Sequence, residues 1–147
     1  MDDRDYIRLV ISDLHLGSLF SKEEKIYSLL QETEFDELIL AGDIIDFIKI
    51  PSFTEHTAKI FNLIEDLAKK KRVIYIVGNH DLVFRKFIGK TVGNIQFVKE
   101  YAFTYNCRRY RIEHGDRYET GIVHWRFMMN IISYQIVINF IYTCQQI

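Results

Sequence analysis

The sequence predicts an α/β fold with a βαβαβ start followed by a β-hairpin. Three short apolar runs rich in β-branched residues alternate with two segments whose apolar residues recur at helical spacing, a pattern typical of a parallel sheet. The length of 147 residues suits one domain. A composition of 48% hydrophobic and 27% charged residues is that of a globular chain, which excludes disordered and collagen-like classes.

The apolar runs predict buried strands over residues 6–12, 37–41 and 73–77, two of which are closed by a glycine. The helical spacing predicts helices over 22–33 and 53–70. Each helix follows a serine with a glutamate three residues later, which predicts two capping boxes, Ser21 with Glu24 and Ser52 with Glu55.

Two alternating segments, 101–105 and 108–113, flank Asn106-Cys107 and predict a β-hairpin. Arginines gather near its end, at positions 108, 109, 111 and 117. We interpret them as the charged outer face of an edge hairpin, with phosphate binding as the alternative.

Polar residues that can bind metal follow the predicted strands directly. They are Asp13, His15, Asp43, Asp46, Asn79, His80, Asp81, His114 and Asp116. Because carboxyl ends of parallel strands share one edge of a sheet, these side chains are expected to meet there. Carboxylate, imidazole and amide donors suit divalent ions such as Mn²⁺, Fe²⁺ or Zn²⁺. A carboxylate at Asp43, on the middle strand, is the natural bridge between two ions.

Four motifs in order, DLHLG (13–17), GDIID (42–46), GNHD (78–81) and HGD (114–116), resemble those of the calcineurin-like metallophosphoesterase superfamily. They look most like the branch that contains UDP-2,3-diacylglucosamine hydrolase. The resemblance implies a β-sandwich of two mixed sheets flanked by helices. The chain looks like the first half, or somewhat more, of such a protein.

The resemblance also implies the metal ligands. Asp13 and His15 would bind the first ion, Asp43 would bridge both, and Asn79 and His114 would bind the second. Two divalent ions are therefore expected, Mn²⁺ first, with Fe²⁺, Zn²⁺ or Mg²⁺ as alternatives.

By the same resemblance, His80 would protonate the leaving oxygen or stabilise developing charge, with Asp81 orienting its ring. The implied activity is hydrolysis of a phosphate ester or pyrophosphate by a metal-bound hydroxide, on a phosphorylated small molecule or a nucleotide-linked lipid. In the diacylglucosamine hydrolase itself, the position matching His80 is usually arginine, which directs the comparison toward its broader relatives.

A late Gly-His-x-His motif, which supplies one histidine to each metal in the superfamily, is absent from these 147 residues. His124 is considered as a substitute ligand, and His56 is interpreted as a surface residue of the second helix. Two alternatives to the phosphoesterase follow: a catalytically incomplete or non-catalytic binding chain, and a phosphodiesterase acting on nucleic acid or cyclic nucleotides. The net charge of −1 gives no strong nucleic-acid signal.

We predict a phosphoesterase domain over residues 1–121 and an apolar helical tail over 122–147, which has one charged residue, Arg126. The tail is interpreted as the start of a lid with peripheral membrane contact or as a surface for a further segment, with a membrane span or a frame-changed sequence as the minor alternatives. The acidic N-terminus is no secretory signal, and two cysteines, Cys107 and Cys144, make no disulfide framework. The expected location is the cytoplasm, at most peripheral to the inner membrane face.

Overall fold

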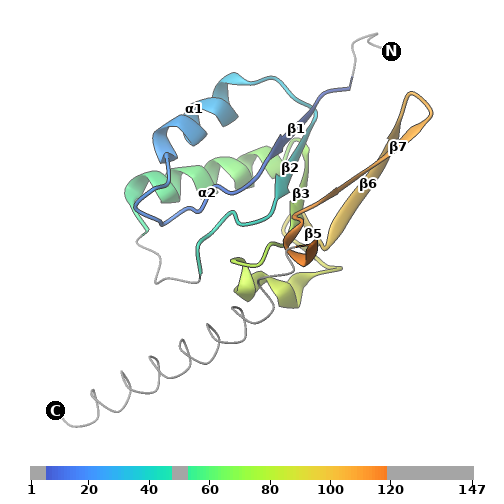
Figure 1. Cartoon of the computed structure of the whole chain (residues 1–147). Helices are drawn as coiled ribbons and strands as arrows, with labels where there is room; N and C mark the ends of the chain where they lie inside the picture. The colour runs from blue at the N-terminus through green and yellow to red at the C-terminus, as the bar shows by residue number, and fades with distance from the viewer. Residues whose placement is uncertain (1–5, 48–52, 119–147) are drawn as a thin grey trace, which may run out of the picture. The chain divides into compact units, whose positions relative to one another are not determined.

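A computed structural model describes residues 6–47 and 53–118 of the chain (Figure 1). The chain divides into two compact units, residues 1–114 and 115–147, of which the second is described only through a short 3₁₀ turn, η2 (Asp116–Tyr118). The described part contains no helix long and apolar enough to cross a membrane. The predictions for the 122–147 tail, for the boundary after residue 121, and for Ser52, His124 and Cys144 fall outside the described residues.

The first unit is built on a five-stranded sheet. Its strands are β1 (Arg8–Ile11), β2 (Glu37–Ala41), β3 (Arg72–Ile76), β4 (Thr91–Val92) and β5 (Ile95–Val98). The strand order is β1-β2-β3-β5-β4, with parallel pairing from β1 to β5 and an antiparallel β4 at the edge. The predicted parallel sheet is confirmed, and it extends by two strands that the apolar pattern did not indicate.

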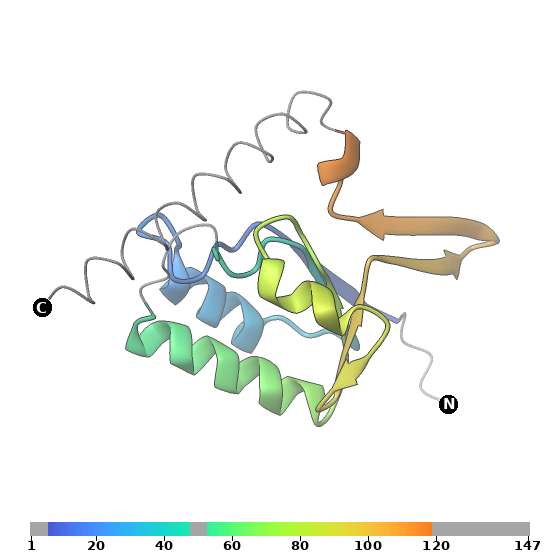
Figure 2. The same ribbon diagram turned by 90° about the horizontal axis from the view of Figure 1, so that it is seen from below.

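Two helices, α1 (Glu23–Glu32) and α2 (Glu55–Ala68), lie side by side against one face of this sheet (Figures 1 and 2). The larger core lies between the helices and the sheet, since alternate strand residues such as Leu38 and Leu40 pack there with Ile60 and Ile64 of α2. Both helices were predicted to within two residues at each end. A 3₁₀ helix, η1 (Leu82–Phe87), completes this face with its phenylalanines.

The predicted capping box of Ser21 with Glu24 is wrong, and the described capping box of α2 uses other residues than predicted. The N-cap of α1 is Lys22, which makes no side-chain cap hydrogen bond, while the Ser21 hydroxyl donates to the carbonyl of Leu14 instead. The capping box of α2 pairs Thr54 with Thr57. Threonine at both positions satisfies the two N–H groups reciprocally, so the helix begins two residues later than the serine signal indicated.

The predicted hairpin is confirmed as β6 (Glu100–Tyr105) and β7 (Arg108–Glu113), which pair antiparallel as a second sheet. Asn106 and Cys107 both have positive φ, 47° and 59°, as a two-residue turn of the I′ type requires. On the other face of the central sheet, Ile39 and Ile74 belong to a second, smaller core. Tyr101 of β6 and Ile112 of β7 pack against this core.

The prediction that the first strand is buried is wrong. β1 lies at the edge of the central sheet, its residues are half-buried or exposed, and Val10 is 44% exposed. A run of apolar residues is consistent with either position, because periodicity alone does not place a strand within a sheet.

A fully buried carboxylate, Glu37 of β2, joins the two sheets. It accepts hydrogen bonds from the Arg8 side chain at 2.7 Å and from the Tyr101 hydroxyl at 2.7 Å, and the Arg72 Nε lies 3.4 Å away. The Arg8 guanidinium also lies over the ring of Phe103, 4.2 Å from its centroid. A buried charge is tolerated only when it is paired in this way.

We expect Glu37→Gln to lower the free energy of unfolding by about 1–3 kcal/mol, because the amide cannot accept from all three donors. Urea unfolding of the purified chain measures this. Glu55→Gln is the matched control, since Glu55 is an exposed partner of Lys59 on the surface of α2, and it should leave the unfolding midpoint unchanged. An equal effect of the two substitutions would contradict the role given to Glu37.

Candidate metal centre

The loops that follow β1 and β2 run alongside each other beyond the ends of the strands. The N–H of Asp13 donates to the Gly42 carbonyl at 3.0 Å, and the N–H of His15 donates to the Asp43 carbonyl at 3.0 Å. Leu16 then forms a parallel bridge with Ile45. This continued pairing places the first two motifs next to each other at the carboxyl edge of the sheet.

Three of the predicted ligands have left-handed backbone conformations. The φ angles of Asp13, His15 and Asp43 are 54°, 45° and 52°. Aspartate and histidine reach this region at lower cost than most residues. Such conformations persist only where surrounding contacts enforce them, and they cluster at functional sites.

One group of donors is formed by Asp13, Asp43 and His114, whose candidate ligand atoms all lie within 4.8 Å of one another. His114 Nε2 lies 3.3 Å from Asp43 Oδ2 and 2.9 Å from Asn79 Oδ1. The structure therefore brings Asp43, which was predicted to bridge two ions, together with both residues that were predicted for the second ion.

A hydrogen bond to the backbone fixes the orientation of the His114 ring. Its Nδ1 lies 3.2 Å from the Ala41 carbonyl, which can only accept, so Nδ1 carries a proton and Nε2 faces Asp43 and Asn79. This is the outer contact that orients histidine ligands in metal sites. Hydrogen bonding to Asp43 raises the pKa of His114 to about 9, against burial, with the Asp43 charge and the Ala41 carbonyl adding to the effect. A cation competes with that proton for the same atoms.

A second group is formed by His15, Asp46 and His80. The His80 Nδ1 lies 3.0 Å from Asp46 Oδ1, and the rings of His15 and His80 meet edge to face at 4.8 Å between centroids. His15 is thus grouped with His80 rather than with Asp13. Asp46 is buried; the sequence placed it among the residues able to bind metal but assigned it no role.

Asp43 lies between the two groups. Its Oδ2 is 3.3 Å from His114 Nε2 and 3.8 Å from His80 Nε2, and its Oδ1 accepts the backbone N–H of His80 at 2.8 Å. Burial raises the pKa of Asp43, but the hydrogen bonds from His114 and from the His80 N–H outweigh burial and hold the pKa below its usual value. The carboxylate is therefore ionised and reaches toward both groups.

Asp81 was expected to orient His80, and the structure corrects this pairing to Asp46. The fully buried Asp81 carboxylate accepts four hydrogen bonds at 2.8–3.1 Å, from the backbone N–H groups of Asp43, Ile45 and Gly78 and from the Tyr75 hydroxyl. Burial and the Asp81 charge hold the pKa of the Tyr75 hydroxyl well above its usual value, so it remains a donor. Asp81 joins the β2 and β3 loops.

Glycine is required at two positions because the backbone approaches these side chains closely. A Cβ at Gly42 would lie 2.4 Å from His114 Nδ1, and Gly42 has a φ of 91°. A Cβ at Gly78 would lie 2.2 Å from Asp43 Oδ1 and 2.5 Å from the Asp43 backbone nitrogen. The two glycines thus make the room that Asp43 and His114 occupy.

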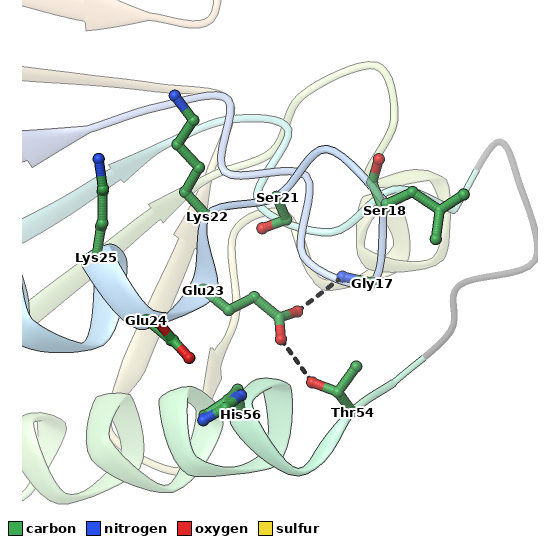
Figure 3. A pocket seen from close by; sticks show the side chains of 10 residues that line it. Gly17, Ser18, Ser21, Lys22, Glu23, Glu24, Lys25, Thr54 and His56 are labelled. Carbon is green, nitrogen blue, oxygen red and sulfur yellow. Dashed lines mark hydrogen bonds between the residues drawn. The ribbon is translucent and has the colours of Figure 1, made fainter.

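Glu23, a carboxylate that the sequence did not single out, holds the loop at the end of the first motif (Figure 3). It accepts from the Gly17 N–H at 3.3 Å and from the hydroxyls of Thr54 and Thr57 at 2.6 and 2.5 Å. Burial raises the pKa of Glu23, but these hydrogen bonds outweigh burial and lower it. Glu23 therefore links the start of α1, the cap of α2 and the DLHLG segment.

The donor set fits divalent ions. Carboxylate oxygens, imidazole nitrogens and one amide oxygen converge, and the His114 ring has the outer hydrogen bond typical of a ligand.

The basic residues at 108, 109 and 111 lie on β7, where Arg111 pairs with Glu113 of the same strand at 3.1 Å and with Glu100 of β6 at 3.9 Å. His56 is exposed on α2, as predicted.

We expect Gly78→Ala to abolish tight Mn²⁺ binding, because its Cβ would collide with both the carboxylate and the backbone of Asp43. Isothermal titration with MnCl₂ measures this loss. The control is Gly89→Ala: a Cβ at Gly89 meets nothing, but the φ of 82° strains any side chain, so stability should fall while Mn²⁺ affinity is kept. Equal Mn²⁺ affinity of Gly78→Ala and the unsubstituted chain would contradict the arrangement.

We expect Asp81→Asn to lower the free energy of unfolding by at least about 2 kcal/mol, because an amide nitrogen would face two buried donors. The measurement is urea unfolding in the presence of a chelator, so that ions play no part. Asp66→Asn on the exposed side of α2 is the control, and its unfolding midpoint should not move. An unchanged midpoint for Asp81→Asn would show that the carboxylate does not hold the two loops together.

One solved structure is similar to part of this chain. A crystal structure of Pseudomonas putida nuclease MPE matches with 26% identity and a TM-score of 0.46, over 67% of this chain and 49% of that one. This chain therefore spans about half the length of that relative. No curated protein sequence matches the chain.

The family comparison covers most of the molecule. The model of the calcineurin-like phosphoesterase family matches residues 8–139, which include all four motifs and every described metal-site residue. The parallel sheet with flanking helices is consistent with that fold. The chain belongs to the calcineurin-like phosphoesterase family.

Proposed function

We propose that the chain carries the larger part of a dinuclear metal centre that hydrolyses a phosphate ester or pyrophosphate. The observation that carries this proposal is the position of Asp43 between two groups of donors, one around His114 and one around His80. A buried carboxylate with ligand groups on both sides is what two neighbouring ions need.

In this proposal Asp43, Asn79 and His114 hold one ion, and Asp13 and His15 hold the other with Asp43 as the bridge. The contacts of His114 with Asn79 and Asp43 support the first assignment. For the second, Asp13 is grouped with Asp43, while His15 comes from the other donor group, beside His80. When bound, the two ions supply Lewis acidity toward the phosphoryl oxygens. Mn²⁺ is our first choice, because the mixed oxygen and nitrogen donors suit borderline-hard ions.

His80 is proposed to move the proton. Its Nδ1 donates to Asp46, which leaves Nε2 on the side of Asp43, where it can hold a proton for the leaving oxygen. A histidine oriented by a carboxylate is the usual arrangement for general acid catalysis near neutral pH. Asp81 acts on this chemistry only through the backbone that it holds.

The finer assignment to the UDP-2,3-diacylglucosamine hydrolase branch stays a prediction. It depends on short motifs, while the residues that would form a lipid-binding lid lie outside the described part of the chain. The described residues support the metal centre, and the surface beside it is where the rest of a substrate would bind.

We expect the chain to retain two Mn²⁺ ions after desalting, and His80→Ala to retain the same number. With an alkyl phosphodiester as substrate, His80→Ala should lower kcat by about 10²–10⁴-fold, because the leaving oxygen loses its proton donor. With a nitrophenyl ester the loss should be much smaller, since that leaving group needs no proton. Elemental analysis and steady-state assays of the two esters measure both effects.

His56→Ala is the matched control, because His56 is an exposed histidine of α2 outside the two donor groups. It should change neither the metal content nor the rate. Loss of metal from His80→Ala would make His80 a ligand, and an equal rate loss on both esters would exclude its role as the acid.

A further inference from the structure

A hollow of about 470 Å³ opens directly beside the metal centre, within the size range of small-molecule sites. Three of its walls are site residues, Asp13, His15 and Asp46. A molecule in this hollow would therefore lie next to the reacting phosphate. The remaining walls decide which substrates fit there, and they include one aromatic ring, Phe20, and one cation, Lys22.

Phe20 has an unusual environment for a large apolar side chain. It is 84% exposed, although it lines a cavity and stands on the loop that follows the DLHLG motif. An exposed phenylalanine gains free energy whenever a flat apolar partner covers it. Because Phe20 lines the hollow that Asp13 and His15 also line, a substrate held at those residues would offer such a partner.

The loop that carries Phe20 is held in place by its own hydrogen bonds. The N–H of Phe20 donates to the Ser18 hydroxyl at 3.3 Å, and the N–H of Ser18 donates to the His15 carbonyl at 3.0 Å. The Ser21 hydroxyl donates to the Leu14 carbonyl at 2.9 Å. The backbone that carries the ring is thus tied to the segment that positions Asp13 and His15.

The walls of the hollow combine apolar side chains, Leu14, Phe20 and Ile26, with polar and charged ones. Such a mixed surface suits a flat ring with hydroxyl groups attached. Lys22, at the start of α1, is exposed and lines both this hollow and the neighbouring one around Glu23. Figure 3 shows its side chain extending away from Glu23. Its charge complements a second, non-reacting phosphate.

We propose that this hollow binds the nucleoside of a nucleotide phosphodiester or pyrophosphate, with Phe20 stacking on the base and Lys22 pairing with a second phosphate. The inference rests on the proposed metal-dependent phosphoesterase and names its substrate class. Stacking is tolerant of base identity, so the hollow selects nucleotides as a class rather than one base.

Binding of three phosphate monoesters to the Mn²⁺-loaded chain tests the proposal. Adenosine 5′-monophosphate offers a flat ring, octyl phosphate an alkyl chain, and glycerol phosphate neither. We expect the nucleotide to bind about tenfold more tightly than glycerol phosphate, about 1.4 kcal/mol, and more tightly than octyl phosphate. Isothermal titration gives all three dissociation constants.

Two substitutions separate the contributions. Phe20→Ala should remove the preference for the nucleotide and leave glycerol phosphate binding unchanged, while Phe53→Ala, at an exposed ring that lines neither hollow, should remove nothing. Lys22→Gln should weaken adenosine 5′-diphosphate more than the monophosphate.

Equal binding of the three esters, or tightest binding of octyl phosphate, would overturn the nucleoside assignment and leave the metal centre standing. A Phe20→Ala chain that keeps the preference would overturn it as well. Failure of the chain to hold Mn²⁺ would instead contradict the proposed function, and the substrate assignment would fall with it.

Discussion

The arrangement of the site depends on one buried carboxylate, that of Asp81. With four donors at hydrogen-bond distance, it fixes the backbone of Asp43 and Ile45 from the β2 loop and of Gly78 from the β3 loop. The Tyr75 hydroxyl, which burial and the Asp81 charge keep protonated, supplies the fourth. A charge buried in this way is tolerated only because every donor is present, so the two loops have one relative position.

That position determines where Asp43 can go. Its backbone is held by Asp81, its side chain accepts the N–H of His80, and Gly78 leaves it the necessary space. The left-handed conformations of Asp13, His15 and Asp43 then follow from contacts that the two loops impose on each other. Strain of this kind costs about 1–3 kcal/mol per residue, and the buried network offsets it.

The sequence predicted the elements that depend on local pattern. The parallel sheet, both helices and the Asn106-Cys107 turn follow from apolar spacing and turn chemistry, and the motifs located Asp43 and His114. It did not predict that Asp46 rather than Asp81 contacts His80. Both aspartates follow a strand, and only the packing of two loops against each other decides which one faces the ring.

The carboxylates of Asp81 and Asp43 have different roles because different groups compensate their charges. Asp81 is fully buried and surrounded by donors that are part of the protein, so its charge is already compensated. Asp43 is also buried, but its Oδ2 faces the ring nitrogens of His80 and His114, which are groups that a cation can bind together with the carboxylate. A cation that binds at Asp43 would therefore add its binding free energy to the stability of the fold, whereas Asp81 stabilises the fold with or without an ion.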